Sequence, residues 1–384
     1  MESKLKFIDH TRSEFFATLK SRVDAYFKDN HISKHANAAM VFKSVLFIGC
    51  LVGTYLLIML GGYGLGTMYL LSLLLGASAA LIGFNVCHDA IHGSYSSKAW
   101  INNALSYVFD LIGASAYVWS VSHNTVHHTY TNIPEHDEDL DVAPGLIRVS
   151  VHERVKPIMR YQHFYAFPLY GLASLSWVFR KDFKKFFQPA IGHVPMKRTL
   201  SSYFRLFFFK FLYYTLFIVF PLVFLDITWW QFLIGFVSMH MLEGLILGLV
   251  FQLAHVVEGV DFPEPNAEGN IEEAWALHQM QTTANFATDS FWANFFCGGL
   301  NMQIEHHLFP KICHIHYTKL QKIVQQTAQE FGVPYVNNPT FMGALASHYR
   351  MLYNMGKGAL EKQASEIQKA VSTSANKVYE SSNA

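Results

Sequence analysis

Long apolar stretches alternate along this chain with polar segments that are rich in histidine and charged residues. Four of these stretches approach the length of about 20 residues that a helix needs to cross a bilayer. They cover residues 39–60, 66–86, 206–225 and 230–257. Only short turns separate the first stretch from the second and the third from the fourth. The pattern therefore predicts four transmembrane helices, arranged as two hairpins.

Two further apolar segments are shorter. Residues 103–121 are interrupted by Asp110, and residues 164–179 are too few to cross a bilayer as one straight helix. We interpret both as interfacial or partly inserted helices. The expected division of the chain is an N-terminal helical segment over residues 1–38, a membrane domain over residues 39–345 and a polar tail over residues 346–384.

Composition supports a membrane protein, because 51% of the residues are hydrophobic and only 15% are charged, whereas soluble domains carry about 25% charged residues. A net charge of +1 argues against a nucleic-acid partner. Lys and Arg crowd residues 1–43 and 148–198 but are absent from the two short turns. By the positive-inside rule, both termini and the long middle segment are expected in the cytoplasm.

Histidines gather in three short clusters, at residues 88–92, 123–128 and 303–307. The first cluster lies at the end of the second apolar stretch, the second lies in the middle segment, and the third follows the fourth stretch. The predicted topology therefore places all three at the same face of the membrane. His255, near the end of the fourth stretch, is expected at that face as well.

Helical spacing indicates how these side chains can share metal ions. Residues four apart lie on one face of a helix, so His88 with His92, and His123 with His127, can each grip one ion. His128 points in a neighbouring direction and can reach a second ion, as the two adjacent histidines of the third cluster can. The predicted ligand set is His88, His92, His123, His127, His128, His255, His306 and His307.

So many imidazoles require more than one ion, and imidazole suits iron, copper, zinc and nickel. Neutral histidines leave the metal charge uncompensated, so groups around them are expected to balance it and to orient the rings. The candidates for this role are Gln303, Asp89, Glu305, Asp137, Asp139 and Asp141. A lone histidine is more often a core residue with satisfied hydrogen bonds, but three clusters at one face favour a dimetal site. Two redox-active ions can use dioxygen to remove hydrogen from unactivated carbon, whereas hydrolysis needs only one.

The clusters and their flanking residues resemble the membrane fatty acid desaturase family. That family is marked by three histidine boxes, which read HDAIH, HNTVHH and QIEHH in this chain. The strings NVCHD before the first box, HTYTN after the second and GGLNMQIEHHLFP around the third are similar as well. The resemblance covers about residues 35–345. It implies an all-α integral membrane fold, with two helical hairpins under a helical cytoplasmic cap that carries a diiron site.

The same resemblance implies oxygen-dependent formation of a cis double bond in a fatty acyl chain, with two iron ions as cofactor. In relatives a histidine near the end of the fourth helix completes the ligand set, and His255 matches it. The substrate would be an acyl-CoA or an acyl-lipid. Hydroxylation, and desaturation of a sphingolipid or a carotenoid, stay open because those enzymes share the boxes. A metal transporter is a remote alternative, since its ligands would lie near the middle of the bilayer.

Two positions depart from the common family pattern. Gln303 replaces the first histidine of the third box, as in front-end desaturases, which act between an existing double bond and the carboxyl end. We expect its side-chain amide to lie next to the metal ligands or to be a weak ligand itself. Phe251 stands one turn before the fourth-helix histidine, where relatives often have Asn.

Electrons must also reach the predicted site. The His-Pro-Gly-Gly haem motif of a fused cytochrome b5 is absent from these 384 residues. We therefore expect a separate donor, a ferredoxin or a cytochrome b5 with its reductase. The lack of fusion makes the chain similar to bacterial members of the family, with the bacterial inner membrane as the expected location.

His240 and Glu243 are ionisable residues in the middle of the fourth stretch. Such groups are costly inside a bilayer and usually face the interior of the helix bundle. They can line an acyl tunnel or orient a head group. A buried hydrogen-bonded pair that packs the helices is an equally good interpretation.

Overall fold

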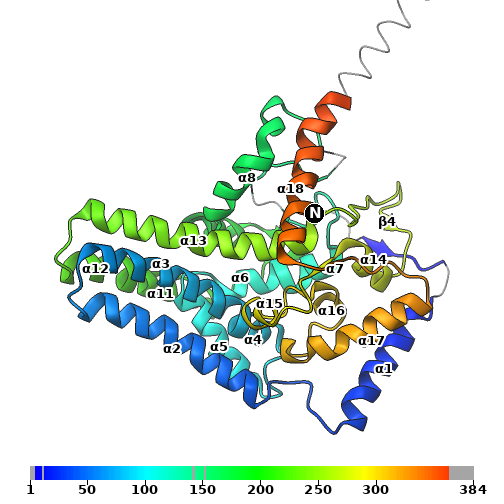
Figure 1. The fold of residues 1–384 in the computed structure, drawn as a ribbon, viewed down its shortest axis with the longest axis horizontal. Coiled ribbons are helices and arrows are strands. Elements are labelled where there is room, and N and C mark those ends of the chain that lie inside the picture. Colours follow the sequence, from blue (N-terminus) through cyan, green and yellow to red (C-terminus); the bar gives the residue numbers. More distant parts are fainter. Residues whose placement is uncertain (1–4, 11–12, 141–142, 151–152, 363–384) are drawn as a thin grey trace, which may run out of the picture.

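The computed structural model describes residues 5–10, 13–140, 143–150 and 153–362. It is mostly helical, with long apolar helices on one side and short helices gathered at the other end (Figure 1). Within the described residues, four helices are long and apolar enough to cross a membrane. They run over Ala38–Leu60, Leu65–His92, Leu200–Phe224 and Trp229–His255. The four predicted apolar helices are therefore present.

The first hairpin joins α2 (Ala38–Leu60) to a longer helix than predicted. α3 (Leu65–Ile82) passes through one π-helical turn, η1 (Gly83–Cys87), directly into α4 (His88–His92). A π-helical turn has one extra residue and redirects the side chains that follow it. The first histidine cluster is thus the final turn of the helix itself.

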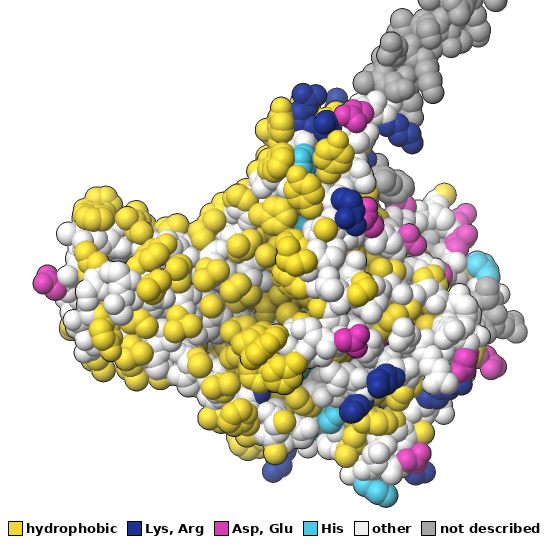
Figure 2. All heavy atoms as spheres, viewed as in Figure 1, with side chains coloured by type: hydrophobic (Ala, Val, Ile, Leu, Met, Phe, Trp, Pro, Cys, Tyr) yellow, Lys and Arg dark blue, Asp and Glu magenta, His cyan; other side chains and the backbone are white. Residues whose placement is uncertain are grey.

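The second hairpin consists of α11 (Leu200–Tyr214), η5 (Thr215–Val219) and α12 (Phe220–Phe224), followed by α13 (Trp229–His255). The most apolar part of the α3 helix is 61% buried, against 22% for that of α11 to α12. α3 therefore occupies the centre of the bundle. On the face that Figure 2 shows, hydrophobic side chains cover most of the bundle, and most Lys and Arg side chains lie away from it.

The segment after the first hairpin is sharply bent. It comprises α5 (Ala99–Leu111), α6 (Ala116–Trp119), η2 (Ser120–His127) and α7 (His128–Tyr130). The axis turns by 111° between α5 and α6. Gly113 has a φ of +99° at this break, and Asp110 Oδ1 accepts a hydrogen bond from the backbone of Ala116 at 2.9 Å. The predicted helix over residues 103–121 is therefore a bent pair of helices.

The middle segment packs along α13. It contains η3 (Pro157–Tyr161), α8 (Gln162–Gly171), α9 (Ala173–Ser176), η4 (Trp177–Lys181), α10 (Asp182–Phe187) and the antiparallel strands β2 (Ala190–Ile191) and β3 (Val194–Pro195). α8 lies very close to α13, because a Cβ on Gly244 would sit 2.3 Å from the carbonyl oxygen of Gly171.

The remaining elements form a lobe at the end of the bundle. They are β1 (Lys6–Phe7), α1 (Phe15–Asp29), β4 (Asn270–Ile271), α14 (Trp275–Thr282), β5 (Asn285–Phe286), α15 (Phe291–Phe296), α16 (Gln303–Leu308), η6 (His314–His316), α17 (Tyr317–Glu330), β6 (Asn337–Asn338), α18 (Phe341–Tyr353) and η7 (Asn354–Gly358). β1 pairs with β4 and β5 with β6, both in parallel. Ile304 and Leu308 anchor α16 in a core shared with α1 and α17, which fixes the third histidine cluster.

Candidate metal centre

The eight predicted histidines meet where the long helices join the lobe. They come from four separate parts of the chain: α4, the η2–α7 segment, the last residue of α13, and α16. All eight are buried, with at most 6% of the surface of any one exposed. They fall into two groups and one intermediate residue.

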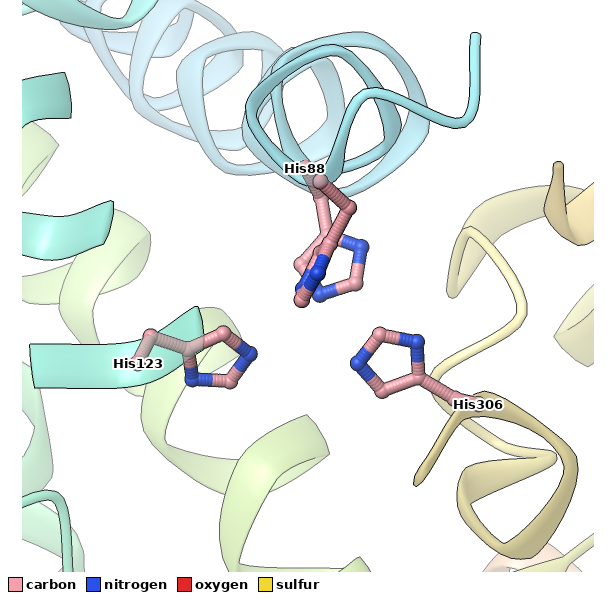
Figure 3. Close-up of side chains that lie close together, drawn as sticks. His88, His123 and His306 are labelled. Atoms are coloured by element: carbon pink, nitrogen blue, oxygen red, sulfur yellow. The ribbon is translucent and has the colours of Figure 1, made fainter. Parts of the chain in front are cut away.

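The first group contains His88, His92, His123 and His306. One ring nitrogen from each lies within 4.8 Å of the corresponding atoms of the others. Figure 3 shows the rings of His88, His123 and His306 turned toward a common centre. Four imidazoles at this spacing match the ligand set of a transition-metal ion.

The second group contains His127, His255 and His307, whose ring nitrogens again lie within 4.8 Å of one another. The amide of Gln303 joins it, because its Nε2 lies 2.8 Å from Nε2 of His255 and 3.3 Å from Nε2 of His307. His128 lies between the groups. Its ring centre is 4.6 Å from that of His306 and 4.3 Å from that of His307.

The pairing of His123 with His127 on one ion is not what the structure shows, since the two rings belong to different groups. The two rings still stack with centres 5.0 Å apart, so the π-helix η2 keeps these residues on one side while their ring nitrogens belong to different groups. The pairing of His88 with His92 agrees with the first group, and His306 and His307 diverge toward the two groups as expected.

The ring nitrogens that face the two groups provide a test of fit for a metal. The buried Nε2 atoms of six of these histidines have no hydrogen-bond partner in the described part of the chain; they belong to His88, His92, His123, His127, His128 and His306. Buried polar atoms are nearly always hydrogen-bonded, because leaving one unpaired costs about 1–3 kcal/mol. Cations between the rings would satisfy all six, so these residues fit metal ions.

Burial and the neighbouring imidazoles set the charge of the third cluster. Burial is the main cause that lowers the pKa of His306 and of His307 well below the ordinary value, and repulsion from nearby histidines lowers both further. Both rings are therefore neutral near pH 7. A neutral imidazole is the form that binds a metal ion.

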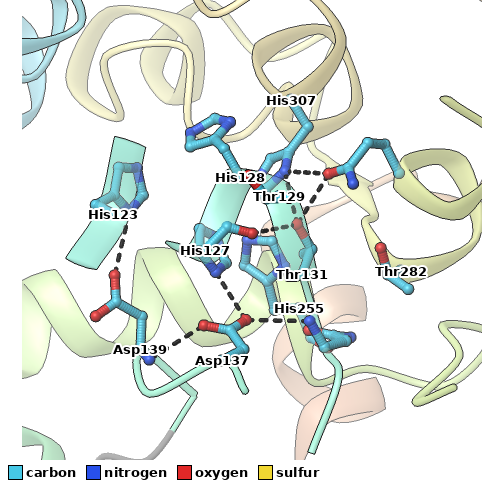
Figure 4. Close-up of polar contacts among 12 residues, drawn as sticks. His123, His127, His128, Thr129, Thr131, Asp137, Asp139, His255, Thr282 and His307 are labelled. Carbon is cyan, nitrogen blue, oxygen red and sulfur yellow. Dashed lines mark hydrogen bonds and ion pairs between the residues drawn. The ribbon is translucent and has the colours of Figure 1, made fainter. Parts of the chain in front are cut away.

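Two carboxylates hold rings from behind (Figure 4). Nδ1 of His127 donates to Asp137 at 2.8 Å, and Nδ1 of His123 donates to Asp139 at 3.3 Å. Burial alone would raise the pKa of Asp139, but Lys185 and the hydrogen bond from His123 hold it well below its usual range. An acceptor at Nδ1 leaves the Nε2 lone pair directed at the metal. The structure thus places Asp137 and Asp139 where the sequence predicts them.

Asp89 and Glu305 have other partners. Asp89 accepts hydrogen bonds from His314 Nδ1 at 2.7 Å and Cys313 Sγ at 3.0 Å. Glu305 accepts from Asn285 at 2.7 Å and from Tyr335 at 3.0 Å. Each follows or precedes a cluster histidine by one residue, which rotates it about 100° around the helix, away from the rings. The expectation that they orient rings is corrected accordingly.

The environment of Glu305 also affects its charge. Burial raises the pKa of Glu305 to about 7, although its hydrogen bonds with Asn285 and Tyr335 work against that shift. Glu305 ties α16 to β5 through Asn285. Asp141, the remaining predicted carboxylate, lies outside the described residues.

Sequence reasoning missed several side chains that hold or cover the rings. Gln279 Oε1 lies 2.8 Å from Nδ1 of His307 and also accepts from Thr131 at 2.8 Å, while Tyr317 lies 3.3 Å from Nδ1 of His306. Gln279 and Tyr317 carry no sequence signal, because they reach the site only through the tertiary fold.

Two aromatic rings border the groups. Trp119 stacks on His123 with ring centres 4.2 Å apart, and its position four residues earlier was a usable sequence signal. Phe251, which the sequence singles out, packs on His127 and His255 with ring centres 5.2 and 4.8 Å apart. Both aromatic side chains are partly buried and pack directly on the imidazole rings.

Known proteins resemble the chain over most of its length. The model of a family described as fatty acid desaturase matches residues 64–339. An sn-1 linoleoyl-lipid 6-desaturase from Synechocystis sp. is 37% identical over 349 residues, 90% of this chain and 96% of that protein. An acyl-lipid (8-3)-desaturase from Physcomitrium patens is 35% identical over 357 residues, 92% of this chain and 74% of that protein. A second sn-1 linoleoyl-lipid 6-desaturase, from Arthrospira platensis, is 34% identical over 349 residues, 89% of this chain and 92% of that protein.

Proposed function

Because the chain belongs to the fatty acid desaturase family, we propose that it introduces a double bond into an acyl chain carried by a membrane lipid. It is therefore an oxidoreductase. The relatives are acyl-lipid and linoleoyl-lipid desaturases, which favours a lipid over a coenzyme A thioester as the acyl carrier. Gln303 in the third box supports a front-end reaction, between an existing double bond and the carboxyl end.

The observation that carries the proposal is the set of eight buried imidazoles in two groups with His128 between them, of which six Nε2 atoms have no hydrogen-bond partner among the described residues. The eight histidines would hold two iron ions. His128 lies between the two imidazole groups, and the Gln303 amide lies beside the second group. Bound iron would supply the oxygen-dependent removal of hydrogen from unactivated carbon. The protein holds two of the rings through Asp137 and Asp139. All eight imidazoles are buried, which favours chemistry away from bulk water.

The proposed orientation puts the histidine end of the bundle in the cytoplasm. α4 and the end of α13 lie at that end, and Lys and Arg are concentrated in the segments that follow and precede the helices there. The positive-inside rule supports this orientation. A ferredoxin or a cytochrome b5 on the cytoplasmic side would deliver electrons to it. A transporter is disfavoured, since the imidazoles gather at one end of the helices instead of along a path.

The test is production of the protein in a host that lacks the activity and is supplied with defined fatty acids. We expect new double bonds in the lipid fraction, located by mass spectrometry, and two iron ions per purified chain. His127→Ala and His306→Ala, one from each group, should abolish product and lower the iron content. The surface variant His10→Ala is the matched control and should retain both. Normal product from either site variant would reject the diiron site, and a hydroxylated product would reassign the reaction.

A further inference from the structure

A dense group of cations lies along the chain between α9 and α11. Residues 180–198 contain six Lys or Arg and a single carboxylate, that of Asp182. Asp182 is buried and pairs with Lys210 of α11 at 2.8 Å, so its charge is already engaged. We call the six cations the basic surface; they are Arg180, Lys181, Lys184, Lys185, Lys197 and Arg198.

The fold brings the two ends of this segment together. The hairpin of β2 and β3 reverses the chain after α10, and the backbone of Met196 donates to the carbonyl oxygen of Pro189 at 3.0 Å. Arg198 Nη1 therefore reaches the end of α10, where it donates to the carbonyl oxygen of Phe187 at 3.1 Å. The cations that follow the hairpin thus lie beside those that precede it.

The basic surface has an inner part and an outer part. Lys185 Nζ lies 3.6 Å and Lys181 Nζ lies 4.0 Å from Asp139 Oδ1. Asp139 Oδ2 in turn accepts from Nδ1 of His123 (Figure 4), so the inner part is tied to the first histidine group. The outer cations are exposed and have no carboxylate partner within the described residues; they are Arg180, Lys184, Lys197 and Arg198.

Large apolar side chains border the outer cations. Phe179, Phe187 and Leu200 are 48%, 49% and 87% exposed, and each lies within two residues of a cation in the sequence. The rings of Phe187 and Phe207 are 6.4 Å apart, so this apolar edge extends onto α11, which begins a membrane span at Leu200. Cations beside exposed apolar side chains are typical of a segment that lies in the head-group region of a bilayer.

We propose that the basic surface binds the phosphate groups of anionic lipids, in the cytoplasmic leaflet for the proposed orientation, with its apolar edge among the lipid tails. Clusters of roughly four to eight Lys or Arg next to a membrane span attract anionic lipids, and each cation near the bilayer raises the affinity about fivefold. An acidic soluble protein would match the charges but would leave the apolar edge without a partner. A lipid surface matches both.

Bound phosphate groups would act on the protein in two ways. They would offset the mutual repulsion of six cations held close together, which disfavours the compact state. They would also lie at a fixed height relative to the first histidine group, because Lys181 and Lys185 contact Asp139 and Asp139 holds His123. The inference goes beyond the proposed reaction, since the anchorage does not depend on what the metals do.

The test measures lipid selectivity in phosphatidylcholine bilayer discs that hold the purified protein and a trace of spin-labelled lipid. Electron paramagnetic resonance gives the fraction of label that the protein immobilises, and the readout is the ratio of phosphatidylglycerol to phosphatidylcholine association. We expect a ratio of roughly five for the wild type and close to one for Lys184→Gln with Arg198→Gln. The charge-keeping pair Lys184→Arg with Arg198→Lys should keep the wild-type ratio. The matched control, Lys319→Gln with Lys322→Gln, removes the same charge from exposed positions of α17 and should keep it too.

A ratio near one for the wild type would overturn the inference. An equal fall in the α17 control would do the same, because selectivity would then follow net charge alone. If the Lys184→Gln, Arg198→Gln variant keeps the lipid ratio but loses salt-dependent reduction by an acidic ferredoxin, the basic surface docks the electron carrier instead. Neither readout needs product, so a wild-type protein that forms no double bond would reject the proposed function and leave the lipid result unchanged.

Discussion

At the scale of single residues, the atom behind each ring decides how strongly that ring can bind. Nδ1 of His127 and of His123 is held by a carboxylate, whereas Nδ1 of His307 is held by the neutral amide of Gln279. A carboxylate makes the imidazole a stronger donor to a cation and balances part of its charge. Each group therefore has one carboxylate behind it: Asp139 holds His123 of the first group, and Asp137 holds His127 of the second.

Asp137 is the more important of the two carboxylates, because its side chain is completely buried and its contact with His127 is shorter. Its Oδ2 also accepts from the backbone of Asn132 at 3.0 Å. We expect Asp137→Ala to weaken iron retention by roughly 10- to 100-fold, with Asp137→Asn between it and wild type. The measurement is the rate of iron loss to a chelator from the purified protein. Glu138→Ala, at a partly exposed neighbour, should behave as wild type; equal rates for Asp137→Ala would contradict the assigned role.

The same residues show what the sequence can and cannot predict about a site. The acidic run after the second cluster predicted Asp137 and Asp139, because residues so soon after His128 in the sequence must still lie near the site. Proximity in sequence misled at Asp89 and Glu305, because one step along a helix turns a side chain about 100°. The sequence could not predict Gln279 and Tyr317, because each contacts its histidine only through tertiary packing.

At the scale of elements, length and apolarity predicted the four long helices, because a bilayer demands both over about 20 residues. The π-helical turns were not predictable in this way. η1 precedes His88, and η2 contains His123 and His127. A single wide turn changes the spacing of hydrophobic residues along the sequence too little to be recognised. These turns nevertheless decide which histidines share a group, and π-helical turns are frequent at functional sites.

The loop before α16 meets η1 at Gly298, which brings the third cluster against the first. Gly298 has a φ of +61°, and a Cβ there would sit 2.4 Å from the carbonyl oxygen of Phe84. Gly298→Ala should therefore lower the free energy of unfolding by roughly 1–3 kcal/mol and reduce iron content by displacing α16. The measurement is a thermal midpoint: the protein in detergent is heated, and the temperature at which half of its gel-filtration peak is lost is compared with that of the wild type. Gly53→Ala, in α2 with nothing within 4 Å, should be neutral or slightly stabilising; equal midpoints would show that the loop adapts.

At the scale of the whole molecule, the bundle and the lobe are joined through the histidines themselves. α4 and α13 bring rings from the long helices, while the η2–α7 segment and α16 bring rings from outside them. Metal ions held between them would cross-link parts of the chain that are more than 200 residues apart in sequence. Ligand binding to the folded state alone stabilises it, so the site and the architecture are expected to depend on each other.

Orientation in the membrane is the remaining property of the whole molecule, and it follows from where Lys and Arg lie. The α12–α13 turn carries Asp226 but no cation, so the positive-inside rule places it outside the cytoplasm. In a Cys50→Ser background, the exposed Asp226→Cys should react with a membrane-impermeant maleimide in intact bacterial cells. Glu268→Cys, exposed in the lobe, should react only after the inner membrane is opened. The three other cysteines are buried, so the parent variant should stay unlabelled. Labelling of Glu268→Cys in intact cells would put the histidine groups on the outer face, where no cytoplasmic donor could supply electrons, and would refute the proposed orientation.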